Sequence, residues 1–250
     1  MIRYFDSNVT LGKMKTPAPG GILDAAKLLA EMDRYGLSEA LVCHALARRH
    51  DPVSGNALAA EAAAPSERLH ACWYVLPTGT DEMPPLDTLA AQMQEADVRA
   101  VRIAPANDAH MFSLAEVVCG DLFAWIERAR LPLFIEQPSV AWADLDAMME
   151  RHPEIRLVLT DVSYRINRDL YPRLKAYSHL YVETSGFQQQ CGIEDVCGRF
   201  GAGRLVFGSR LPTLCAGAAM HAVEHAAIDE DAKAAVGGDN LRSMIAEVRL

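Results

Sequence analysis

Several common sequence signals are missing from this chain. Its six cysteines, at 43, 72, 119, 191, 197 and 215, include no Cys-x-x-Cys pair, which argues against a zinc knuckle, a redox motif or a disulfide scaffold. Basic residues are outnumbered, because 24 Lys and Arg stand against 33 Asp and Glu and the net charge is −9. Such an acidic chain offers no basic face to a phosphate backbone or an anionic lipid, so we expect neither nucleic acid nor a membrane surface as a partner.

Long apolar runs are missing as well. No stretch approaches the roughly 18 apolar residues of a membrane span, and residues 1–6 lack the basic and apolar segments of a signal peptide. We therefore expect a cytoplasmic protein whose partner is a small-molecule substrate. Cys43 and Cys72 lie inside apolar, strand-like runs, so we expect both thiols to pack in the core.

The chain does contain one unit that recurs eight times: a short apolar run, a polar segment and an amphipathic helix. The expected strands are 2–6, 39–43, 69–75, 100–104, 132–136, 155–159, 179–183 and 204–207. The expected helices include 23–35, 86–95, 114–130 and 145–152, followed by 229–235 and 240–248 with a break at 237–238. Nearly continuous apolar strands that alternate with helices predict one α/β domain over 1–250, a (β/α)8 TIM barrel with extra C-terminal helices.

Polar side chains follow most of the expected strands, where a barrel of this kind places its reacting groups. The predicted catalytic residues are Asp161, Glu136, Arg210 and His44. The predicted substrate-binding residues are Asn8, Thr10, Trp73, Arg102, Tyr164, Arg165, Glu183 and Ser185. Carboxylates and guanidiniums that converge on one barrel mouth predict a pocket for a small anionic molecule. The alternative is that these groups only pair with one another.

Short segments in order along nearly the whole chain carry a resemblance to a known family. They are FDSNVTLG at 5–12, LAEMDRYG at 29–36, VRAVRIAP at 98–105, LPLFIE at 131–136, LVLTD at 157–161, FGSRLP at 207–212 and GDNLRSMI at 238–245. The chain resembles a divergent amidohydrolase-related TIM barrel of the amidohydrolase 2 branch, which is similar to aminocarboxymuconate-semialdehyde decarboxylase. The resemblance implies hydrolysis, or decarboxylation, of a small molecule.

The resemblance also implies where a metal ion would lie. Family members that bind zinc use His-x-His on the first strand, histidines on the fifth and sixth strands, and Asp on the eighth. The matching positions here are Asn8, Thr10, Glu136, Asp161 and Arg210. An amide, a hydroxyl and a fixed cation do not replace zinc ligands, and a guanidinium repels a divalent ion. We therefore expect no cofactor. The alternative is a divalent metal held by Asn8, Glu136 and Asp161, whose oxygens suit magnesium.

The residue types at the expected mouth favour a hydrolase that acts on a small anionic ester, lactone or amide. Asp161 or Glu136 would serve as general base, and Arg102 and Arg210 would orient the substrate and stabilise negative charge. His44 is an alternative proton carrier. Two other functions stay open: a decarboxylase or lyase that acts on a small carboxylic acid, and a barrel without catalytic activity that binds a small molecule.

Two further segments stand out. His221-Ala-Val-Glu224-His225 matches the H-x-x-E-H pattern of one metalloprotease class, but that class needs a carboxylate far downstream, so we interpret this segment as a solvated helix face. The segment 44–56 gathers four basic-type side chains and then offers Gly-Asn before an Ala-rich stretch. It is a candidate lid or homodimer contact, and Asn56 is expected to cap the next helix.

Overall fold

Parallel strands form the centre of the molecule. The computed structural model describes residues 2–18, 20–21, 23–187 and 189–250. Its strands are β1 (Phe5–Leu11), β2 (Glu39–His44), β3 (Leu69–Ala71), β4 (Trp73–Tyr74), β5 (Val101–Ile103), β6 (Leu133–Glu136), β7 (Leu157–Thr160), β8 (Leu180–Glu183) and β9 (Leu205–Val206). Each strand that pairs with the next does so in parallel. β3 and β4 are two parts of one barrel strand, because Cys72 between them still donates its N–H to the Val42 carbonyl oxygen at 2.9 Å.

The sheet closes on itself between its last and first strands. The Ser7 N–H donates to the Phe207 carbonyl oxygen at 3.0 Å, and the Thr10 N–H donates to the Leu211 carbonyl oxygen at 2.9 Å. A closed parallel sheet leaves no exposed edge and buries both faces of every strand. The predicted (β/α)8 barrel is confirmed.

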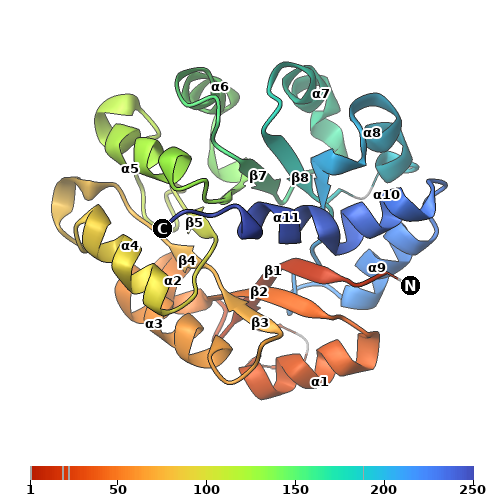
Figure 1. The fold of residues 1–250 in the computed structure, drawn as a ribbon, viewed down its shortest axis with the longest axis horizontal. Coiled ribbons are helices and arrows are strands. Elements are labelled where there is room, and N and C mark those ends of the chain that lie inside the picture. Colours follow the sequence, from red (N-terminus) through yellow and green to blue (C-terminus); the bar gives the residue numbers. More distant parts are fainter. Residues whose placement is uncertain (1, 19, 22, 188) are drawn as a thin grey trace.

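Helices surround the barrel (Figure 1). They are α1 (Ala25–Tyr35), α2 (Ala45–Arg49), α3 (Pro52–Ala63), α4 (Leu86–Glu95), α5 (Glu116–Arg128), α6 (Trp142–Arg151), α7 (Asn167–Ala176), α8 (Gly192–Phe200), α9 (Ala216–Glu224), α10 (Glu230–Ala234) and α11 (Asn240–Ala246). The described helices include none that is long and apolar enough to cross a membrane.

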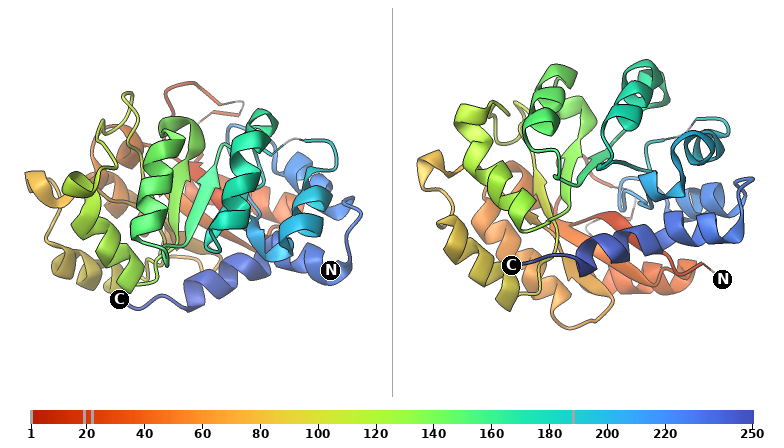
Figure 2. Two further views of the ribbon diagram at one scale, coloured as in Figure 1. Left: turned by 90° about the horizontal axis from the view of Figure 1, so that it is seen from above. Right: turned by 45° about the horizontal axis from the view of Figure 1, so that its top comes forward.

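The last helix covers one end of the barrel. Leu241 and Met244 of α11 pack against buried side chains from the starts of the strands, among them Phe5, Phe134 and Val158. Arg156, which is only 4% exposed, donates to the Met244 carbonyl oxygen at 2.9 Å. In the left view of Figure 2, α11 and the segment after β1 lie at opposite ends of the barrel. Because α11 covers the end of the barrel where the strands begin, a site has room only at the opposite end, where the strands finish.

The expected helix break at 237–238 is wrong. A π-helical turn, Ala235–Asp239, joins α10 to α11 without interruption. A Cβ on Gly237 would lie 2.3 Å from Ile2 Cγ2, and one on Gly238 would lie 2.4 Å from the Arg3 carbonyl oxygen. The two glycines therefore allow the N-terminal segment to pack closely against the helix. They do not end the helix, as the sequence had suggested.

The expected cap at Asn56 is also wrong. The N-cap of α3 is Asp51, whose carboxylate accepts the Ser54 N–H at 3.0 Å. Asn56 lies within α3 and is 3% exposed. Its amide donates to the Tyr74 carbonyl oxygen at 2.7 Å and accepts the Tyr74 N–H at 2.8 Å. Asn56 therefore replaces a strand partner for β4, which is only two residues long.

Two smaller expectations concern the first strand and the cysteines. β1 continues to Leu11, so Asn8 and Thr10 lie within the strand and not after it. Cys43 and Cys72 are 2% and 1% exposed, as predicted for thiols that pack in the core. All six cysteines are free.

Candidate functional site

A cavity of about 370 Å³ lies at the C-terminal ends of the strands. Its wall comes from β1 and the segment that follows it, from α2, and from the ends of β4 to β7 and β9. Six predicted site residues line this cavity, which we call the mouth pocket: Asn8, Thr10, Arg102, Glu136, Asp161 and Arg210. The fold therefore brings together half of the residues that the sequence proposed for the site.

Arg210 and Asp161 form an ion pair in the mouth pocket. The Arg210 Nη2 donates to Asp161 Oδ2 at 2.8 Å, and the two side chains are 39% and 16% exposed. Both residues have left-handed backbones, with φ of 56° for Asp161 and 60° for Arg210. Non-glycine residues in that conformation store strain and are enriched at functional sites. Burial raises the pKa of Asp161, and the Glu136 charge adds to the rise, while the guanidinium of Arg210 opposes it.

Glu136 is paired with a residue that the sequence analysis did not select. Arg48 of α2 donates from Nε to Glu136 Oε1 at 2.7 Å and from Nη2 to Oε2 at 2.5 Å, a bidentate geometry of the strong kind. Burial raises the pKa of Glu136. The hydrogen bonds and charge of Arg48, together with the charges of Arg102 and Arg210, outweigh burial, so the pKa lies below its ordinary value. Glu136 therefore stays ionised and engaged.

Arg102 lines the pocket without an ion pair to any carboxylate of the described residues. It is 5% exposed, its Nη2 donates to the Ser7 carbonyl oxygen at 2.7 Å, and its guanidinium carbon lies 5.0 Å from the centre of the Phe134 ring. Its buried Nε has no hydrogen-bond partner among the described residues. A buried guanidinium with a free N–H and no carboxylate bonded to it is a ready partner for an anionic group.

Glu183 lies beneath the mouth pocket and does not line it. It is fully buried. Its Oε2 accepts from Asn8 Nδ2 at 2.9 Å and from Ser185 Oγ at 2.8 Å, and its Oε1 accepts the Ser185 N–H at 2.5 Å. Burial raises the pKa of Glu183 to about 7, with the Asp6 carboxylate adding to the rise. Glu183 thus holds the Asn8 amide that lines the pocket above it.

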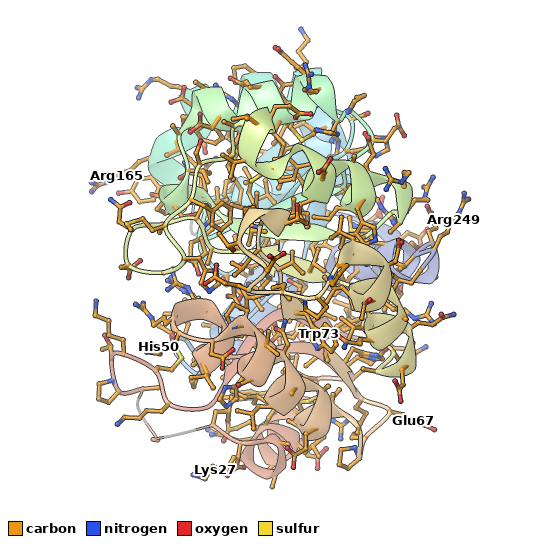
Figure 3. All side chains as sticks on the ribbon, turned by 90° about the vertical axis from the view of Figure 1, so that its left-hand side faces the viewer. Lys27, His50, Glu67, Trp73, Arg165 and Arg249 are labelled. Carbon is orange, nitrogen blue, oxygen red and sulfur yellow. The ribbon has the colours of Figure 1, made fainter. Side chains whose placement is uncertain are left out.

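The remaining predicted residues lie away from the mouth pocket. His44 accepts the Leu46 N–H at its Nδ1 and begins α2, and its ring covers Gly12; burial lowers its pKa. Trp73 packs in the core between strands and helices. Tyr164 and Arg165 contact each other at the surface, and Figure 3 shows Arg165 and His50 at one end of the molecule and Arg249 at the other. Ser185 lines a neighbouring cavity.

Sequence reasoning missed several residues of the pocket wall. Arg48, Arg49, Tyr74 and Lys15 all line it. The cluster of basic residues at 44–56 was the available signal for the two arginines, because the structure places α2 in the pocket wall. The lid and the homodimer contact both stay predictions for this segment.

The mouth pocket is cationic although the whole chain is acidic. Five cationic side chains line it, Lys15, Arg48, Arg49, Arg102 and Arg210, against the two carboxylates Glu136 and Asp161. Arg49 also pairs with Asp108, which lies outside the lining, at 2.9 Å. A concave surface with this excess focuses positive potential on its interior. The pocket is built to attract an anion.

The residues of the mouth pocket do not fit a zinc ion. Both of its carboxylates are bonded to guanidiniums, and no imidazole or thiolate of the described residues lines it, whereas zinc sites use several imidazole, thiolate or carboxylate ligands. The only group of three His, Cys, Asp or Glu side chains within the described residues whose ligand atoms lie within 4.8 Å of one another is His221, Glu224 and His225.

Comparisons with known proteins agree with the architecture. No protein-family profile and no curated protein sequence matches the chain. Solved structures do match over nearly full length. The 5-carboxyvanillate decarboxylase from Sphingomonas paucimobilis has a TM-score of 0.74 at 13% identity and full coverage of both chains. A putative 2-pyrone-4,6-dicarboxylic acid hydrolase from Pseudomonas putida has a TM-score of 0.72 at 15% identity, with 99% of this chain and 98% of that one covered.

A third match was solved with a metal. The 5-carboxyvanillate decarboxylase from Novosphingobium aromaticivorans, with bound manganese and 3-methoxy-4-hydroxy-5-nitrobenzoic acid, has a TM-score of 0.76 at 13% identity, with 98% of this chain and 97% of that one covered. At such identities the likeness shows the fold alone: this chain and these three proteins share a TIM-barrel fold.

Proposed function

We propose that the mouth pocket binds a small carboxylic acid and that the chain hydrolyses an ester or lactone bond in it without a metal ion. The excess of cations over carboxylates in the pocket carries this proposal. Arg102 lines the pocket and bonds no carboxylate among the described residues, so its charge is available to an anionic group. A volume of about 370 Å³ suits a molecule of the size of a substituted aromatic or pyrone acid.

Asp161 is the proposed general base. Its Oδ2 is bonded to Arg210, while its Oδ1 accepts no hydrogen bond from the described part of the chain, so Oδ1 is free to accept a proton from water. The water oxygen forms a bond to the substrate carbonyl carbon as its proton passes to Asp161. The carbon–oxygen bond to the leaving group then breaks, and Asp161 returns the proton to the leaving oxygen. A carboxylate whose pKa is raised by burial is suited to both transfers.

Arg210 is the proposed stabiliser of the negative charge that develops on the carbonyl oxygen. Its side chain is 39% exposed toward the pocket and is bonded through Nη2, which leaves other N–H groups of the guanidinium for substrate. A fixed cation beside developing charge supplies the kind of electrostatic stabilisation on which acyl transfer depends. Arg48 is bonded to Glu136 and keeps it ionised. Glu136 therefore does not take the proton that water gives to Asp161.

Decarboxylation is the second candidate, and two observations favour it. Several matching structures are named as decarboxylases of aromatic acids. The raised pKa of Asp161 also makes its protonated form accessible, and that form would supply a proton to the carbon that loses carbon dioxide. The pocket residues are the same in both proposals, and only the product differs.

A screen of aromatic and pyrone carboxylic acids, with and without ester or lactone bonds, tests the proposal. Product mass separates the addition of water from the loss of carbon dioxide. Asp161→Asn should abolish turnover and Arg210→Gln should strongly reduce it, both with the fold intact, while Arg151→Gln, an exposed arginine on α6 paired with Glu116, should leave turnover unchanged. Activity should survive exhaustive chelation. Turnover that needs an added divalent metal, or that persists in Asp161→Asn, would overturn the mechanism.

A further inference from the structure

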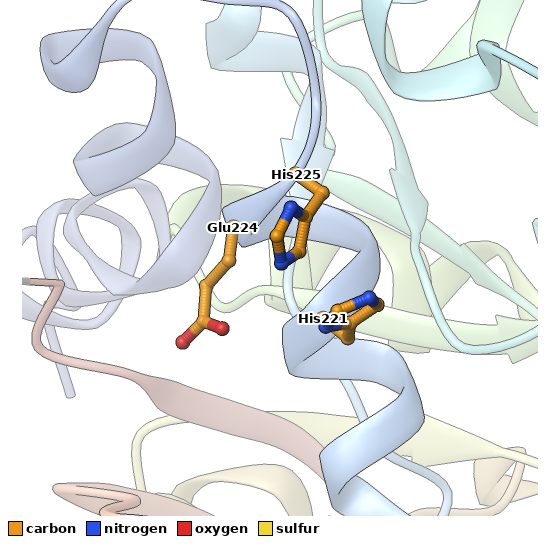
Figure 4. A group of neighbouring side chains, drawn as sticks. All are labelled: His221, Glu224 and His225. Atoms are coloured by element: carbon orange, nitrogen blue, oxygen red, sulfur yellow. The ribbon is translucent and has the colours of Figure 1, made fainter.

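The C-terminal turn of α9 carries a cluster that the mouth pocket does not use. His221, Glu224 and His225 are all exposed, and one ligand atom from each lies within 4.8 Å of the others. The His225 N–H donates to the His221 carbonyl oxygen at 3.0 Å, which is the helical pattern that places side chains four residues apart on one face. The two ring centroids are accordingly only 3.9 Å apart, and Figure 4 shows the rings side by side with Glu224 beside them.

These two histidines differ from most others in the chain. The remaining histidines, apart from exposed His50, contact a helix N–H, a backbone carbonyl or a carboxylate: His44, His70, His110, His152 and His179. Within the described residues, the rings of His221 and His225 make no side-chain hydrogen bond or ion pair, and they contact each other. Two neutral imidazoles at this spacing on a helix are a known arrangement for binding zinc.

The surroundings of the cluster also favour a cation. The last carbonyl groups of a helix carry partial negative charge, so a positive ion is stabilised at the end of α9. The Glu224 carboxylate lies near the Tyr4 hydroxyl, whose pKa is raised by burial and then by the Glu224 charge. The imidazoles line a second cavity, of about 720 Å³, so an ion there has room to keep water as a further ligand.

We propose that His221, Glu224 and His225 form a surface site for a divalent transition-metal ion of the zinc type. Two imidazole nitrogens and one carboxylate oxygen are the donor set that zinc accepts with a position left open. The site lies at the end of α9, on residues that do not line the mouth pocket. The proposal of a metal site therefore does not depend on the function proposed for that pocket. Because imidazole binds metal only when neutral, the affinity should fall as the solution is acidified.

Calorimetric titration of ZnCl2 into protein without a histidine tag tests the proposal. We expect saturable binding of about one ion per chain and a rise in melting temperature with zinc concentration, as mass action requires. His221→Ala and His225→Ala should each weaken binding by about tenfold or more, and Glu224→Gln by less. His50→Ala, which removes an exposed histidine from outside the cluster, should bind as the parent does.

The same titration separates this site from a metal in the mouth pocket. Asp161→Asn should leave zinc binding unchanged if the ion is held on α9. The absence of saturable binding, or equal affinity in the His221→Ala/His225→Ala double variant and the parent, would overturn the proposal. Because the three side chains are exposed, the substitutions should leave the fold intact, and circular dichroism checks this.

Discussion

Asp161 directly follows β7, Arg210 follows β9, and the two side chains meet through a hydrogen bond of 2.8 Å, each on a left-handed backbone. The pair sets the charge state of the mouth pocket, because burial raises the pKa of Asp161 and the guanidinium opposes that rise. A general base acts when it is deprotonated, so turnover should increase with pH through a pKa above that of free aspartate. We therefore expect Arg210 to influence the pH at which turnover begins.

Replacement of Arg210 by Gln should move this pH dependence upward. Without the guanidinium of Arg210, burial and Glu136 raise the pKa of Asp161 against only the weaker opposing charges of Arg102 and Arg48, so residual turnover should need a higher pH than in the parent. The pH profile of residual activity, or the carboxyl 13C NMR titration of Asp161, measures the shift. If turnover is lost at the same pH in both proteins as the solution is acidified, another group is the base.

Loss of Arg48 should destabilise the chain. The two side chains of the Arg48–Glu136 pair are only 18% and 25% exposed, so Arg48→Ala leaves a carboxylate largely buried and unpaired, at a cost of about 1–3 kcal/mol in the free energy of unfolding. The pKa of Glu136 should also rise. Arg34→Ala, which breaks the exposed pair with Glu31, should cost less than about 0.5 kcal/mol. Urea denaturation at neutral pH compares the two variants, and equal losses would contradict the prediction.

Glu183 should make the chain less stable as pH rises. Its pKa is raised from 4.5 to about 7 in the folded chain, so the folded state holds a proton that the unfolded state has released. The stabilisation is fully present below the unfolded pKa and is lost as pH rises through the folded one.

Glu183→Gln tests this directly, because a side chain that does not ionise removes the effect. The difference in unfolding free energy between pH 5 and pH 8 should shrink by roughly 2 kcal/mol relative to the parent. Glu61→Gln, an exposed residue of α3, should leave the difference unchanged. Identical pH dependence in Glu183→Gln and the parent would mean that Glu183 is ionised in the folded chain.

A methyl group at position 208 should not fit. A Cβ on Gly208 would lie 2.2 Å from Glu183 Oε1, a carboxylate fixed by three hydrogen bonds. Gly208→Ala should therefore lower the free energy of unfolding by about 1–3 kcal/mol. Gly198→Ala is the matched control, because a Cβ there meets nothing within 4 Å, and within α8 it should stabilise by up to about 1 kcal/mol. Thermal melts of both variants measure the contrast.

The barrel could be predicted from the sequence because hydrophobic periodicity is a local property. Every expected strand has a counterpart, and the helix expected at 86–95 matches α4 residue for residue. The mouth pocket was partly predictable for the same reason, since residues that follow parallel strands must lie at one end of the barrel. His44 and Trp73 show the limit of this rule, because the direction of a side chain at a strand end decides whether it faces the pocket or the helices.

By itself, the sequence determined eight strand–helix units, the closed barrel they form and the polar character of its mouth, because each of these follows from the spacing of apolar residues along the chain. Only the tertiary structure decided that Arg48 bonds Glu136, 88 residues away, and that Arg210 bonds Asp161 and not Glu136. It also brought Asn56 to the backbone of Tyr74 and Gly208 to the carboxylate of Glu183. Such pairings depend on how the closed sheet aligns distant strand ends and on which side-chain rotamers then fit. The spacing of apolar residues along the chain does not determine either one.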